Sequence, residues 1–183
     1  MNSKKRIIGV VPVGDVPKLA PKIIAAHITG YLKLSAEILT PLQLPAGAFD
    51  EIQLKYDAAK ALKCFESGTY DNYDKVIGVF NVDFFIPTFA YVFGEAEQGG
   101  KYALVSLFRL AEVIKGQNPP SAVACERAAK VALHELGHLY NLFHCEDQKC
   151  LMHYSGGLAD LDSIPLYFCR YCNTYLADAL GRL

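Results

Sequence analysis

Three histidines and one glutamate fall within the eleven residues 134–144, in the sequence HELGHLYNLFH. On a helix, His134 and His138 lie at i and i+4, so both imidazoles point to one side and could hold one metal ion. Glu135 lies about 100° round from His134, outside the coordination site but near enough to reach a water bound there. This HExxH spacing is typical of zinc hydrolases, in which the glutamate acts on that water.

His144 is the candidate third ligand. A continuing helix would carry it about 120° round from His138, so the helix has to end between the two. Asn141 is the predicted stop, because asparagine tolerates the left-handed backbone conformation better than most residues other than glycine. The simpler alternative is that the histidines are polar residues of an amphipathic helix. The third histidine and the cysteines that follow it argue against that alternative.

Four cysteines follow in two close pairs, and eighteen residues separate the pairs: Cys145, Cys150, Cys169 and Cys172. This spacing predicts a tetrahedral zinc site with four thiolate ligands, which is structural because no position remains for water or substrate. Two disulfides or a redox-active Cys-x-x-Cys are the rival interpretations. No apolar signal-peptide core precedes the first predicted strand, so we expect a cytoplasmic protein in which the cysteines stay reduced.

Together these residues resemble the archaemetzincin family of zinc metallopeptidases. The shared pattern is His134-Glu135-x2-His138-x5-His144-Cys145-x4-Cys150-x-Met152, followed by Ser155, Asp162 and Cys169-x2-Cys172. Upstream, the segments 83–87 and 89–96 are similar to the family's approach to the active-site cleft and its edge strand. The family pattern has glycine where this chain has Asn141.

The resemblance implies two zinc ions, one catalytic and one structural. It also implies that Met152 lies in a methionine-containing turn that forms an apolar floor beneath the histidines. An ordinary buried methionine would pack in much the same way. Some other metzincins carry a tyrosine two residues after this methionine that swings toward the zinc, so Tyr154 is a candidate stabiliser of the oxyanion.

Composition bounds the remaining possibilities. The chain has 183 residues, with 18 basic and 19 acidic side chains and a net charge of -1, which gives no reason to expect a nucleic-acid partner. No apolar run is long enough to cross a membrane. The length predicts a single domain over 1–183, with a subdomain over 1–141 and a smaller zinc-stapled subdomain over 142–183. We expect a monomer.

Hydrophobic periodicity predicts the elements that position these residues. It favours strands over 6–13, 36–42 and 75–80, helices over 18–34 and 56–66, and a hairpin of 89–93 with 102–108. Gly68 ends the second helix, and residues 118–121 open the helix that carries His134 and His138. The predicted fold class is therefore α/β (α+β), with a mixed twisted sheet packed against the active-site helix.

The predicted function is that of a zinc-dependent metalloendopeptidase or aminopeptidase-like protease, acting on a peptide or protein substrate with Glu135 as general base. If residues 89–93 form an exposed edge, an extended peptide could add to it as one more strand. Two alternatives remain. One is a catalytically weak peptide-binding protein in which His144 is held off the metal, and the other is a zinc hydrolase of non-peptide amides.

Overall fold

The computed structural model describes residues 6–66, 70–110 and 121–182. The strands are β1 (Ile7–Val13), β2 (Ser35–Ile38), β3 (Phe49–Asp50), β4 (Lys55–Asp57), β5 (Lys75–Phe80), β6 (Phe84–Ile86), β7 (Phe89–Val92), β8 (Gly94–Ala96) and β9 (Tyr102–Ser106). The α-helices are α1 (Leu19–His27), α2 (Ala58–Leu62), α3 (Ala122–Leu139), α4 (Leu158–Ser163) and α5 (Arg170–Ala179), with shorter helical turns at Ile28–Leu32, Ala46–Ala48 and Lys63–Phe65. The predicted helix stop at Gly68 and the predicted helix opening at 118–120 lie outside the described residues.

The main sheet has five strands in the order β2-β1-β5-β9-β8. The first four are parallel, and β8 is added antiparallel at the edge next to β9. A smaller sheet has the order β3-β4-β6-β7. Each sheet thus ends in a short strand from the segment 89–96, and these two edges, β7 and β8, border the cleft described below.

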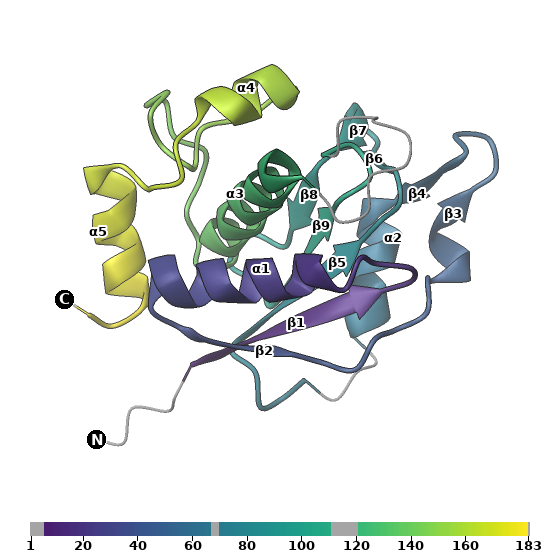
Figure 1. The fold of residues 1–183 in the computed structure, drawn as a ribbon, viewed down its shortest axis with the longest axis horizontal. Helices are drawn as coiled ribbons and strands as arrows, with labels where there is room; N and C mark the ends of the chain where they lie inside the picture. The colour runs from purple at the N-terminus through teal and green to yellow at the C-terminus, as the bar shows by residue number, and fades with distance from the viewer. Residues whose placement is uncertain (1–5, 67–69, 111–120, 183) are drawn as a thin grey trace.

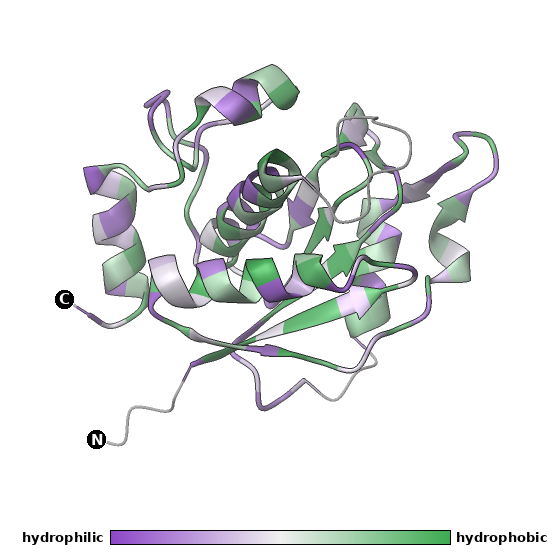
Figure 2. Cartoon of the chain, viewed as in Figure 1, coloured by the Kyte–Doolittle hydropathy of each residue, from purple (hydrophilic) through white to green (hydrophobic). Residues whose placement is uncertain are grey.

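Helices cover both faces of the main sheet, with α1 and α3 on one side and α2 on the other (Figure 1). Alternate residues of one strand therefore enter different cores: Val10 packs with α1 and α3, whereas Val11 packs with α2. Strands buried on both faces read as continuous apolar runs, as β1 and β5 do. Figure 2 shows the central strands mostly in green, whereas helix α5 at the periphery is a mixture of purple, pale and green residues.

The predicted fold class is confirmed, and the main strands and helices lie close to their predicted positions. The predicted hairpin is wrong in its first strand. The partner of β9 is β8, with Glu95 opposite Leu104, whereas β7 pairs with β6 in the smaller sheet. Between the two strands lies Phe93, which is buried in the core. The aromatic residues Phe89, Tyr91 and Phe93 alternate up to the change of sheet, so periodicity alone does not reveal it.

Two basic side chains of α3 are buried, and both tie the helix to the segment around α4. Arg127 is 4% exposed and donates from Nε and Nη2 to the two carboxylate oxygens of Asp162, at 2.7 and 2.6 Å. Lys130 is 3% exposed and donates from Nζ to the carbonyl oxygen of Leu161 at 3.1 Å. Within the described part of the chain, no helix is long and apolar enough to span a membrane.

Replacing the carboxylate of Asp162 tests this attachment. Asp162→Asn removes the negative charge from the pair with the buried Arg127 guanidinium, and water compensates in part because the Asp162 side chain is 43% exposed. We expect a loss of about 1 kcal/mol in the free energy of unfolding at pH 7, measured by urea denaturation. Asp178→Asn, on the exposed side of α5, is the matched control and should be neutral.

The same pair predicts a pH dependence. The hydrogen bonds of Arg127 lower the pKa of Asp162 below its ordinary value. A carboxylate whose pKa is depressed by folding stabilises the protein above its unfolded-state pKa, and that stabilisation disappears as the pH falls through the folded-state pKa. The difference between wild type and Asp162→Asn should therefore shrink in strong acid. An equal difference in strong acid and at pH 7 would contradict this assignment.

Candidate active site

The active-site helix α3 begins and ends at residues suited to those positions. Ser121 caps its first turn by accepting a hydrogen bond from the amide of Ala124 at 3.1 Å. At the other end Asn141 has φ 67°, the left-handed conformation predicted for it. The amide of Asn141 donates to the carbonyl of His138, and the amide of Leu142 donates to the carbonyl of Gly137, each at 2.9 Å. These paired bonds form a Schellman motif, which turns the chain back beside the helix.

Two of the imidazoles face each other at a short distance. The Nε2 atoms of His134 and His138 are 3.0 Å apart. Their Nδ1 atoms lie 2.7 Å from the carbonyl oxygen of Leu151 and 2.8 Å from that of Leu142, so both Nδ1 atoms donate a hydrogen. In neutral rings both Nε2 atoms then present lone pairs to each other. Two such lone pairs repel unless a cation lies between them.

His144 completes this group after the turn. Its ring centroid lies 5.3 Å from that of His134 and 4.9 Å from that of His138. One ligand atom from each of the three residues lies within 4.8 Å of the others. Zinc–nitrogen bonds of about 2.0–2.1 Å place tetrahedral ligand atoms roughly 3.3 Å apart. The three nitrogen donors therefore fit a zinc ion, and His144 is not held away from the other two histidines.

The four paired cysteines form a second cluster beside the first. One sulfur from each of Cys145, Cys150, Cys169 and Cys172 lies within 4.8 Å of the others, and the Cys145 and Cys169 sulfurs are 3.8 Å apart. Zinc–sulfur bonds of about 2.3 Å imply sulfur–sulfur distances of roughly 3.8 Å in a tetrahedron. All four are free thiols. This donor set suits a closed zinc site.

Hydrogen bonds couple the cysteine loop to the histidines. Leu151 accepts a hydrogen from His134 Nδ1 and donates its own amide to the carbonyl of Tyr167 at 2.8 Å. Cys145 donates its amide to the carbonyl of Met152 at 2.9 Å, and its own carbonyl accepts from His153 Nδ1 at 2.8 Å. The loop that carries the thiols therefore also orients one of the imidazoles.

Met152 is fully buried under the helix turn that carries the histidines. Its sulfur packs directly against the backbone of Gly137, where a Cβ atom would collide with it and would lie 3.1 Å from the methionine Cε. Glycine in a helix interior costs about 1 kcal/mol relative to alanine. Here it permits the close approach of the thioether, which is the position implied for a methionine floor.

Burial sets the protonation states of the centre. Burial and the neighbouring His138 lower the pKa of His134 to about 3, and burial also lowers the pKa values of His138 and His144. All three rings are therefore neutral at pH 7, which is the form that binds metal. Burial, together with the charge of Glu95, raises the pKa of Glu135 well above its ordinary value. A carboxylate with a raised pKa accepts protons more readily near neutral pH.

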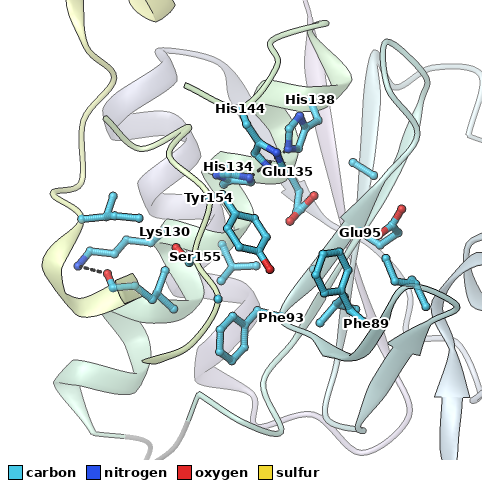
Figure 3. A pocket seen from close by; sticks show the side chains of 18 of the residues that line it. Phe89, Phe93, Glu95, Lys130, His134, Glu135, His138, His144, Tyr154 and Ser155 are labelled. Atoms are coloured by element: carbon cyan, nitrogen blue, oxygen red, sulfur yellow. Dashed lines mark hydrogen bonds between the residues drawn. The ribbon is translucent and has the colours of Figure 1, made fainter. Parts of the chain in front are cut away.

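The histidines and Glu135 open into a cleft of about 410 Å³ (Figure 3). Phe89 of β7 and Tyr154 approach each other across it, with ring centroids 5.9 Å apart. Tyr154 also lies beside His144, at 5.6 Å between ring centroids. Its hydroxyl points away from the histidines and toward Phe89 in Figure 3, so a contact with an oxyanion would require the ring to rotate. The role of Tyr154 stays a prediction.

Gln98 is a positioning residue that sequence patterns did not reveal. Its amide donates to the carbonyl of Leu142 at 3.0 Å, the same oxygen that accepts from His138, and lies 3.3 Å from Oδ1 of Asn141. The amide of Gly99 also donates to the carbonyl of His138 at 2.9 Å. The tip of the β8–β9 hairpin thus braces the helix end. A glutamine in a turn carries no local signal of such a long-range contact.

Substitution at Asn141 tests the turn. Asn141→Gly retains the left-handed backbone at no steric cost and should keep zinc at the histidines. Asn141→Val places a β-branched residue at positive φ, which costs about 1–3 kcal/mol and should weaken zinc binding there. Metal analysis and thermal unfolding of both variants provide the measurement. Equal zinc content and stability in the two variants would show that the turn does not constrain the site.

Comparison with known proteins gives a consistent result. The chain matches Peptidase family M54 over residues 22–178. It is 34% identical over 171 residues to the archaemetzincin of Methanocaldococcus jannaschii, covering 93% of each chain. It is also 34% identical over 182 residues to the archaemetzincin of Pyrococcus furiosus, covering 96% of this chain and 95% of the relative.

Solved structures agree with this. The crystal structure of the archaemetzincin of Methanopyrus kandleri superposes with a TM-score of 0.85 at 30% identity, covering 100% of this chain and 99% of the other. That of the Archaeoglobus fulgidus archaemetzincin, complexed with malonate, gives a TM-score of 0.80 at 27% identity over 92% of this chain and 99% of the other. Family match, identity and fold lead to one conclusion. The chain belongs to peptidase family M54, the archaemetzincins, and is a zinc metallopeptidase.

Proposed function

We propose that the protein hydrolyses peptide bonds in the cleft beside His134, His138 and His144, which would hold one zinc ion. The observation that carries this proposal is the convergence of three neutral imidazoles next to the buried carboxylate of Glu135. Zinc bound there supplies Lewis-acid chemistry, because it acidifies water and polarises a carbonyl group. Three protein ligands leave a coordination position open, as catalytic sites require.

Glu135 is the proposed general base. Its carboxylate takes a proton from the water that attacks the scissile carbonyl, and then delivers that proton to the nitrogen of the leaving amine. Burial and the raised pKa of Glu135 support both steps, because the carboxylate can hold the proton between them. General acid–base catalysis of this kind contributes about 10²- to 10⁴-fold in rate.

The edge strand β8 is the proposed binding site for the peptide main chain. The carbonyl of Phe93 and the amide of Glu97 bond to β9, so the alternation of the strand directs the N–H and C=O groups of Gly94 and Ala96 outward. An extended peptide can pair with these groups as one more strand. Residues 89–92 do form an edge strand, β7, but it belongs to the smaller sheet. The edge of the sheet that packs on the active-site helix is β8.

The lining of the cleft supports a substrate side chain of apolar character. Val131 lies one helical turn before His134 and lines the cleft together with Leu161, Ile164 and the aliphatic stem of Lys130. The ammonium group of Lys130 donates to the Leu161 carbonyl and lies 2.9 Å from a carboxylate oxygen of Glu126, so its charge is already compensated. Both endopeptidase and aminopeptidase cleavage fit this geometry, and peptides with acetylated N-termini separate them.

The second part of the proposal concerns the cysteine cluster and the setting of the protein. The four thiols would hold a structural zinc, which stabilises a loop whose residues 143–149 include no buried side chain. Thiolate ligands persist in a reducing compartment, which supports a cytoplasmic location. One chain contains every residue proposed for the site, so a monomer suffices for activity.

Loss of the general base is the direct test of the mechanism. Glu135→Gln keeps the shape of the side chain but removes its basicity, so we expect kcat to fall by about 10²- to 10⁴-fold while zinc is retained. Digestion of a peptide library, read by mass spectrometry, compares this variant with the wild type. Cleavage by the variant at the wild-type rate would rule out Glu135 as the base. Cleavage of acylated small molecules in place of peptides would favour hydrolysis of other amides.

Metal analysis tests the two proposed zinc sites. The native protein should retain about two zinc ions per chain, and His144→Ala about one, with little loss of stability. Cys172→Ser should affect both sites, because the cysteine loop also carries the carbonyl of Leu151 that orients His134. We therefore expect this variant to hold less than one tightly bound zinc and to unfold at a lower temperature. A full complement of zinc in Cys172→Ser would contradict the assignment.

A further inference from the structure

Gly94 lies on the edge strand β8 directly against the side chain of Glu135. Its strand partner is Val105, which is buried in the core together with α3. A Cβ atom at position 94 would therefore point toward α3. It would lie 2.7 Å from Cγ and 2.8 Å from Cδ of Glu135, and closest of all to Oε1.

Those distances are shorter than any real Cβ contact, so a methyl group and the carboxylate cannot share this space. Cδ and Oε1 form the far end of the Glu135 side chain, and Cγ moves with them when the Cα–Cβ bond rotates, whereas the strand is held by its hydrogen bonds to β9. The carboxylate is the part that would move. A side chain at position 94 is therefore expected to displace the carboxylate and to leave the fold unchanged.

Packing and not polar contact fixes the position of the Glu135 carboxylate. Its side chain is 7% exposed, and no hydrogen bond or ion pair joins it to another residue in the described part of the chain. Three rotatable bonds separate the carboxylate from the helix backbone. Contact with the bare backbone of Gly94 is therefore a principal restraint on where it lies.

We propose that Gly94 is a positioning residue for the general base. The absent side chain forms a slot that seats the Glu135 carboxylate against the edge strand, on the same residue whose N–H and C=O groups face outward toward a bound peptide. This places the base beside the main chain of the substrate. The inference rests on the proposed role of Glu135. Isolated glycine within a strand is a known sign of close approach by another group, and it is the sequence signal for this contact.

The substitution Gly94→Ala tests the slot. Displacement of a catalytic group by about 1 Å can cost about 10²-fold in rate, so we expect kcat to fall by about 10- to 100-fold. KM should change by less than about threefold, because the outward backbone groups remain. Zinc content and the midpoint of thermal unfolding should match the wild type. Gly47→Ala is the matched control, since a Cβ atom there meets no other atom within 4 Å.

Two further measurements separate positioning from other effects. A crystal structure of Gly94→Ala should show the Glu135 carboxylate displaced while β8 keeps its place. In the Glu135→Gln background, where no base remains, Gly94→Ala should leave the dissociation constant of an uncleaved peptide unchanged within about threefold. An equal loss of peptide affinity and of rate would assign Gly94 to substrate binding and overturn the proposal.

Each remaining outcome is also decisive. Wild-type kcat in Gly94→Ala, with Glu135→Gln inactive, overturns the slot and leaves the general base in place. A large drop in thermal stability or in zinc content also overturns the proposal. Either result would show that the strand had moved and the carboxylate had not. Wild-type activity in Glu135→Gln itself would instead overturn the proposed function, so the two failures are distinguishable.

Discussion

The left-handed backbone at Asn141 is the constraint on which the rest of the site depends. A helix that continued past this point would carry His144 round the axis and away from the other two histidines. The Schellman hydrogen bonds satisfy the carbonyls at the end of α3 and turn the chain back in a single residue. Every later feature, from the third histidine to the cysteine loop, follows from that reversal.

The segment after the turn has few apolar contacts of its own. Hydrogen bonds hold it in place instead. Residues 143–149 have no buried side chain, whereas Cys150, Leu151 and Met152 are buried in succession. The backbone of this loop meets both clusters, since Leu151 bonds to His134 while Cys145 follows His144 directly. Because the two proposed metal sites share one loop, a displacement at one site is expected to displace the other. The geometry of the histidines then depends on the integrity of the thiols.

The rigid part of the site is the contact between α3 and the main sheet. Small residues on the buried face of the helix, Ala128, Ala129 and Ala132, let it lie close to the strands. Two glycines allow equally close contacts beside the proposed catalytic residues. Gly137 leaves room for the methionine, and Gly94 leaves room for the carboxylate of Glu135. Close backbone approach positions side chains that make few hydrogen bonds.

Sequence alone determined the parts of this protein that depend on local spacing. The i, i+4 placement of His134 and His138, the helix end at Asn141 and the two cysteine pairs are all local, because helix geometry and turn preferences act over a few residues. The buried strands β1 and β5 are also visible, since burial on both faces requires continuous apolar runs.

Tertiary structure decided what depends on contacts between distant segments. The change of sheet at Phe93, the carbonyl of Leu151 that orients His134, and the brace from Gln98 each join residues far apart in sequence. Periodicity cannot reveal such pairs, because strand pairing and side-chain contacts are selected by packing of the whole core and not by neighbouring residues. For the same physical reason, the sequence predicts Glu135 as the base, but only the folded chain shows the backbone of Gly94 against it.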